Sequence, residues 1–95
     1  MKTVQDYKED FVLFLELGFI AVNQMDADAA MKLFEASEII DPKSSLPKVG
    51  RGYYHINKLE LNHAANLFNE VLKEEPKNEM AKTFLGLTYA LTPDQ

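Results

Sequence analysis

The chain of 95 residues contains no cysteine. This absence excludes a disulfide-stabilised scaffold, a thiolate metal site and catalysis by a thiol. Only four glycines and four prolines are present, too few for a collagen-like or linker-like chain. Basic residues are outnumbered by acidic ones, and the net charge of −5 does not provide the cationic surface that nucleic-acid binding needs.

Long hydrophobic runs are missing as well. The longest apolar stretch, Phe11–Val22, is interrupted by Glu16 and is shorter than the ~20 residues of a membrane span. Acidic residues follow Lys2 before any apolar run begins, which is not the pattern of a targeting segment. With 46% hydrophobic and 26% charged residues, the composition is that of a globular domain. We therefore expect one soluble, cytoplasmic domain without membrane insertion.

What the sequence does contain is an internal repeat. The dipeptides Asp41-Pro42 and Glu75-Pro76 lie 34 residues apart, and the same register superposes Gly18, Gly52 and Gly86, Ala30 and Ala64, and Phe34 and Phe68. Small residues are needed where paired helices approach closely, large rings fill the space between hairpins, and proline ends a helix. The pattern predicts an all-α fold of five helices, over Val4–Asn23, Ala27–Ile40, Leu46–Lys58, Leu61–Lys73 and Glu79–Leu91. Helix N-caps are expected at Asp26 or Asp28, at Ser44 or Ser45, and at Asn78.

A 34-residue period with these small and aromatic positions resembles the tetratricopeptide repeat (TPR), a helix-turn-helix unit. The resemblance implies a solenoid of about two and a half repeats in a single domain, 1–95. It would comprise an N-terminal cap (1–10), repeat one (11–44), repeat two (45–78) and a capping half-repeat (79–95). Lys48, Arg51 and His55 occupy positions that the family usually fills with aromatic or aliphatic residues, so repeat two is expected to pack least regularly.

The sequence offers little for catalysis or for metal binding. His55 and His63 lie on different predicted helices, and the serines have no base arranged beside them. Gly50-Arg51-Gly52 lies inside a predicted helix and lacks the context of a phosphate-binding loop, so Gly50 is interpreted as a second close-packing position. The acidic pair Asp26 and Asp28 lacks the further ligands of a calcium loop. We expect no enzymatic activity, no catalytic residue, no metal site and no cofactor.

The family resemblance also implies a concave groove lined by the first helix of each pair. The groove positions, the second, fifth, ninth, twelfth and thirteenth of each repeat, are Val12, Leu15, Phe19, Val22, Asn23, Leu46, Val49, Tyr53, Ile56, Asn57, Met80, Thr83, Leu87, Ala90 and Leu91. None is charged, so the carboxylate clamp of heat-shock co-chaperones cannot form here. The asparagine pair, Asn23 and Asn57, could bind polar groups of a ligand backbone.

The last predicted helix is apolar most of the way round. Phe84, Leu85, Thr88 and Tyr89 are expected to face inward, whereas Met80, Leu87 and Leu91 are expected to face the groove. No polar capping helix covers it in the predicted arrangement.

An uncharged groove favours an amphipathic helix of a protein partner as its ligand. In size, repeat number and groove character, the chain resembles the small TPR-type chaperones of bacterial type III secretion, a virulence system. The resemblance implies that the partner is a small secreted needle subunit, with a second small co-chaperone present in some complexes. Three alternatives remain: a homodimer, an assembly adaptor that acts through the last helix, and a monomer whose groove residues pack on each other.

Overall fold

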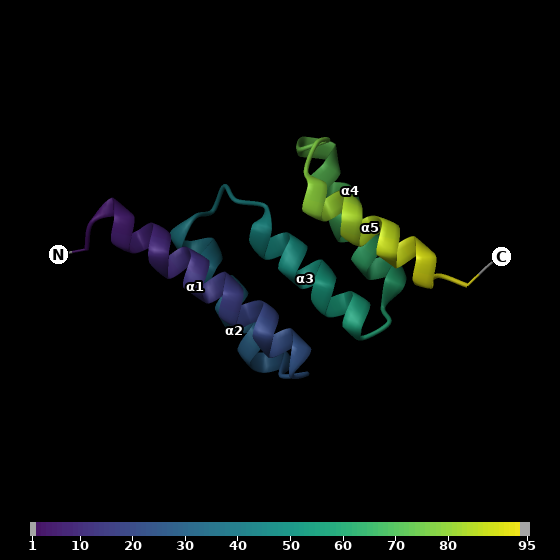
Figure 1. Ribbon diagram of the computed structural model, residues 1–95, viewed down its shortest axis with the longest axis horizontal. Helices are drawn as coiled ribbons and strands as arrows, with labels where there is room; N and C mark the ends of the chain where they lie inside the picture. The colour runs from purple at the N-terminus through teal and green to yellow at the C-terminus, as the bar shows by residue number, and fades with distance from the viewer. Residues whose placement is uncertain (1, 94–95) are drawn as a thin grey trace.

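The computed structural model describes residues 2–93, which form five α-helices and, within that range, no strand. The helices are α1 (Val4–Asn23), α2 (Ala27–Ile40), α3 (Leu46–Asn57), α4 (Leu61–Glu74) and α5 (Glu79–Leu91) (Figure 1). The predicted all-α class with five helices is confirmed. Only two helix ends differ from the prediction, each by one residue, because α3 ends at Asn57 and α4 ends at Glu74.

The helices form two hairpins and an additional helix. α1 packs on α2, α3 packs on α4, and α5 packs on both α3 and α4. α1 and α3 are also in contact, and so are α3 and α5; in Figure 1, α1 lies in front of α2 and α5 lies in front of α4. The Cα positions extend over 55 × 29 × 15 Å. The first helices of the successive hairpins therefore form one broad side of a flat molecule.

Side chains at the helix starts satisfy backbone N–H groups that have no partner within the helix. Thr3 and Asp6 form a reciprocal capping box at α1, a feature that sequence reasoning missed. Asp26 accepts a hydrogen bond at the start of α2 and Asn78 does so at the start of α5, as predicted. Ser45 occupies the N-cap position of α3 but makes no side-chain capping bond there.

Both hairpin turns have the same backbone form. Met25 and Leu59 occupy equivalent positions and both have positive φ angles, 60° and 59°. The N–H groups of Met25 and Asp26 donate to the carbonyls of Val22 and Ala21, which is the hydrogen-bond pattern of a Schellman motif. Leu59 closes α3 in the same way. Each hairpin therefore reverses through a residue in the left-handed region, where glycine would be less strained.

The core of each hairpin is one phenylalanine packed against glycine. Phe34 and Phe68 are fully buried. A Cβ atom added to Gly18 or to Gly50 would lie 2.5 Å from the Phe34 ring, and one added to Gly52 would lie 2.5 Å from the Phe68 ring. The predicted close-packing roles of these three glycines are confirmed, and the Phe34 ring lies between two of them.

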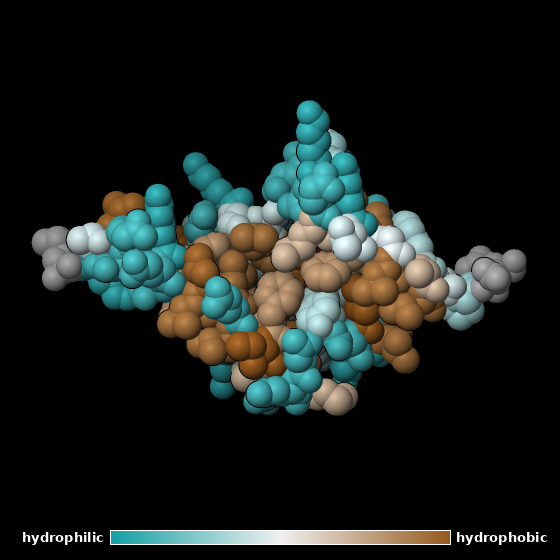
Figure 2. Space-filling model, viewed as in Figure 1, coloured by the Kyte–Doolittle hydropathy of each residue, from teal (hydrophilic) through white to brown (hydrophobic). Residues whose placement is uncertain are grey.

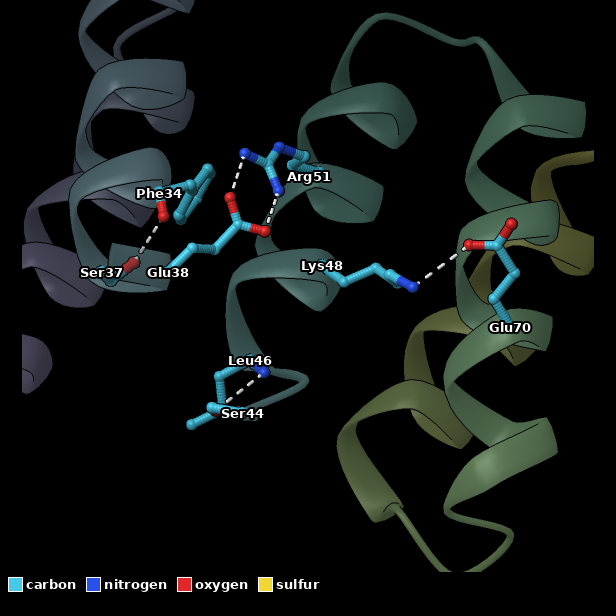
Figure 3. A network of polar contacts seen from close by, with 8 residues as sticks. All are labelled: Phe34, Ser37, Glu38, Ser44, Leu46, Lys48, Arg51 and Glu70. Atoms are coloured by element: carbon cyan, nitrogen blue, oxygen red, sulfur yellow. Dashed lines mark hydrogen bonds and ion pairs between the residues drawn. The ribbon is translucent and has the colours of Figure 1, made fainter. Parts of the chain in front are cut away.

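The polar residues of repeat two find partners on neighbouring helices. Arg51 donates two hydrogen bonds of 2.6 Å to the carboxylate of Glu38 on α2 (Figure 3). Lys48 pairs with Glu70 on α4, with 3.4 Å between Nζ and Oε2. α3 thus carries an ion pair towards each neighbouring second helix, which explains how polar side chains are accommodated at positions that are usually apolar.

Candidate binding face

The predicted groove corresponds to the broad side formed by α1, α3 and α5, here called the first-helix face. Figure 2 shows hydrophobic side chains gathered over α1 and α5, with paler residues over α3 between them and hydrophilic side chains at the margins. Val12 on α1 is 50% exposed, and Leu87 on α5 is 42% exposed. The exposed members of the predicted set are Val12, Asn23, Asn57, Met80, Thr83, Leu87, Ala90 and Leu91.

Four residues predicted to line the groove lie in the core instead. Leu15 and Val22 belong to the cluster around Phe34, and Val49 and Ile56 belong to the cluster around Phe68. Their side chains are covered by neighbouring helices, so they support the first-helix face from beneath and are not available to touch a ligand. Leu46 is half-buried.

A row of aromatic rings crosses the middle of the face. The centroid of Phe19 on α1 lies 5.5 Å from that of Tyr53 on α3. Tyr53 in turn stacks on Phe84 of α5 at 5.3 Å. These distances are typical of favourable ring pairs. The row joins all three first helices and is only partly exposed, so it forms a preformed apolar floor.

The two asparagines at equivalent positions differ in their hydrogen bonds. The Tyr53 hydroxyl donates to Oδ1 of Asn23 at 2.5 Å. Nδ2 of Asn57 donates to the carbonyl of Tyr53 at 2.9 Å. Asn23 thus holds the Tyr53 side chain, whereas Asn57 bonds back to the backbone of its own helix. Within residues 2–93, the Asn23 Nδ2 donor and the Asn57 Oδ1 acceptor make no side-chain hydrogen bond, and both residues are exposed.

The histidines form a compact pair between α3 and α4. The rings of His55 and His63 are stacked with centroids 3.8 Å apart. Nδ1 of His55 lies 2.9 Å from Oε1 of Glu60, and this hydrogen bond lowers the pKa of the exposed Glu60 carboxyl. No group of three or more potential metal ligands is found in the described part of the chain. The stack therefore packs α3 against α4, a role that the sequence did not show because the two residues are eight positions apart.

The outer side of α5 corrects one prediction. Thr88 is fully buried, and Phe84 and Leu85 are partly buried, as expected for inward-facing residues. Tyr89, also predicted to face inward, is 57% exposed. The position equivalent to Tyr89 in repeat two is His55, which stacks on the second helix α4; none of the described residues forms a second helix over α5. The prediction for Tyr89 was wrong for this reason.

A separate apolar hollow, which sequence reasoning missed, lies at the other end of the molecule. It has a volume of about 460 Å³ and is bordered by Val4, Tyr7, Phe11, Val12 and Ile40, among others. It lies between the start of α1 and the end of α2. Of the predicted binding residues it contains only Val12.

Comparisons with family models, curated proteins and solved structures give no match for this chain. Within residues 2–93, no helix combines the length and the apolar character needed to cross a bilayer.

Proposed function

We propose that this chain is a non-enzymatic, TPR-type protein-binding module whose first-helix face holds an amphipathic helix of a partner protein. In its specific form, the proposal is a cytoplasmic chaperone of bacterial type III secretion that masks the apolar stripe of a needle subunit before export. The observation that carries the proposal is the set of exposed apolar side chains on α1 and α5, on either side of the Phe19–Tyr53–Phe84 row.

The chemistry of the face supports a helical ligand. Aliphatic residues repeating at i, i+3, i+4 and i+7 of an amphipathic helix would cover Val12, Met80, Leu87 and Leu91, which are exposed. The aromatic floor needs little rearrangement, so less ordering entropy is lost on binding. An interface of ~1,200–2,000 Å² is sufficient for a stable complex. Burying the apolar stripe would remove the surface through which such a subunit polymerises.

The test uses two charge substitutions on the face and one matched control. Leu87→Glu and Val12→Glu each place a carboxylate on the exposed apolar surface, and Ile39→Glu makes the same change at a 77% exposed position of α2. Each protein is expressed with an affinity tag in the cells that naturally produce the chain and is purified by that tag. The mass of any stoichiometric partner is then measured. We expect a small helical protein that polymerises when released, retained by wild type and Ile39→Glu and lost from the two face variants.

Retention of that partner by Leu87→Glu and Val12→Glu, in proteins with unchanged circular dichroism, would refute the proposal. An adaptor that acts through α5 is the alternative favoured by one observation, the exposure of Tyr89 outside the first-helix face. A homodimer is the other alternative. Sedimentation equilibrium of the purified chain distinguishes the homodimer from the groove-binding module and from the adaptor, because only the homodimer associates without a partner.

A further inference from the structure

Gly86 is the one glycine of this chain that no packing contact explains. A Cβ atom built on Gly18, Gly50 or Gly52 would collide with a buried phenylalanine ring, whereas a Cβ atom on Gly86 meets nothing within 4 Å. Glycine in the interior of a helix is unfavourable because it loses more backbone freedom than any other residue on folding. α5 therefore carries this cost without an intramolecular contact that would offset it.

The surroundings of Gly86 form an apolar surface with a polar edge. Tyr89, one turn along the helix, is 57% exposed, Ala90 is exposed, and Leu85 is half-buried. Glu79 and Lys82 stand at the N-terminal edge, with 4.0 Å between their charged atoms. An apolar centre with charges at its margin is the usual anatomy of a protein interface.

Both hairpins of this chain contain a second helix packed on the glycine of the first helix. In the first hairpin, the Phe34 ring of α2 lies over Gly18, and Ala30, four residues earlier on α2, is completely buried. In the second hairpin, Phe68 and Ala64 of α4 are buried in the same way, with the Phe68 ring over Gly52. The 34-residue register places Gly86 at the equivalent position of α5. The complementary ligand is therefore a helix with alanine and phenylalanine four residues apart.

A folded second copy of this chain does not have such a helix available. Both of its Ala-x-x-x-Phe helices are already packed on their own glycines, and all four of those residues have 0% exposure. We infer that the face of α5 around Gly86 binds an Ala-x-x-x-Phe helix from a partner protein, with the phenylalanine ring over Gly86. The bound helix would complete a third hairpin. Gly86 and Tyr89 lie outside the first-helix face, and only Ala90, at the boundary, belongs to both surfaces, so the inference goes beyond the proposed function.

The probe is a synthetic peptide of residues 60–75, acetylated and amidated, which carries the pattern in Ala64 and Phe68. It is titrated to millimolar concentration into the ¹⁵N-labelled full chain, because a free helix of this length is only marginally stable and binds weakly. We expect amide shifts centred on Gly86, Leu85 and Tyr89. The same peptide with Phe68→Ala should bind at least about tenfold more weakly, since it lacks the buried ring.

Two protein variants test the surface. Gly86→Leu places a residue that favours helix at a position where a Cβ atom meets nothing within 4 Å, and Tyr89→Lys changes an exposed side chain. Each should abolish the shifts and leave the circular dichroism spectrum unchanged. Several results would overturn the inference: no shifts at millimolar peptide, equal binding by the Phe68→Ala peptide, unaffected binding by Gly86→Leu, or shifts centred on Gly52 through exchange with α4. A dimer of the free chain that Gly86→Leu dissociates would show instead that a second copy covers the face.

Discussion

The same substitution, glycine to alanine, should have opposite effects at equivalent positions of the three first helices. At Gly18, the new methyl group would lie 2.5 Å from Cε1 and 2.9 Å from Cδ1 of Phe34. That ring is completely buried and lies against Gly50 on its other side, so it has nowhere to move. At Gly52, the methyl group would meet the buried Phe68 ring at the same distance. At Gly86, it would meet nothing within 4 Å.

The magnitudes follow from two opposing terms. Alanine gains about 0.8–1 kcal/mol over glycine in a helix interior. Overpacking a closed core costs typically ~1–3 kcal/mol. At Gly18 and Gly52, the 2.5 Å approach to a fully buried ring places the overpacking cost in the upper part of its range. The cost then exceeds the gain, and we expect the free energy of unfolding to fall by roughly 1–2 kcal/mol. At Gly86 there is no clash and only the gain remains, so the free energy of unfolding should rise by about 0.5–1 kcal/mol.

Urea denaturation followed by circular dichroism measures these differences, and a thermal melt provides a second readout. For a domain of this size, 1 kcal/mol corresponds to roughly 4–8 °C in Tm, so the variants should melt on opposite sides of wild type. A stabilised Gly18→Ala protein would show that the Phe34 ring can move aside. A destabilised Gly86→Ala protein would show that the surface of α5 around Gly86 is already covered in the free chain. Either result would refute the expectation that an added methyl group clashes with a fixed ring at Gly18 and meets open space at Gly86.

Three further predictions concern polar contacts and turns. Glu38→Gln should lower the free energy of unfolding by about 0.5–1 kcal/mol, because it weakens the two-bond pair with Arg51. Arg51 holds the pKa of Glu38 below its usual value. The stabilisation by this ion pair is therefore fully present above the pKa of Glu38 in the unfolded chain, and it is lost as the pH falls through the lower pKa of Glu38 in the folded protein. Urea denaturation at decreasing pH should show the stabilities of the wild type and Glu38→Gln converging. Met25→Gly and Leu59→Gly should each raise Tm, since about 1–2 kcal/mol of left-handed strain is relieved. Asn78→Ala should cost roughly 1 kcal/mol of unfolding free energy through loss of the α5 cap, as measured by urea denaturation.

Most of the fold could be predicted because the 34-residue period positions both helices of each hairpin at once. Proline after Asp41 and Glu75 marks the ends of α2 and α4, and the glycine–phenylalanine register locates the contacts inside each hairpin. The turn residues could not be predicted in this way. Met25 and Leu59 have poor preference for positive φ, and their conformation is imposed by the close approach of the helices on either side.

The binding face was predicted less completely than the fold. A repeat position specifies which helix carries a residue, but exposure depends on the neighbours in the stack. Leu15 and Val49 occupy the fifth position of their repeats, where the adjacent first helix covers them. Thr83, at the same position of α5, is exposed, as is Tyr89 at the eleventh. Position within a repeat therefore predicts burial only where a following helix is present.

α5 has two exposed apolar sides, and they can be perturbed separately. At about 100° per residue, Met80, Leu87 and Leu91 fall within one narrow sector, and Gly86 and Tyr89 fall well outside it. The buried residues Ala81 and Thr88 complete the circumference and fix the helix against α3 and α4. Leu87→Glu should therefore abolish binding to the first-helix face and leave the 60–75 peptide bound, whereas Gly86→Leu should do the reverse. If one substitution eliminated both interactions, the two surfaces would form a single site, and the separation of ligands argued from the glycine register would be wrong.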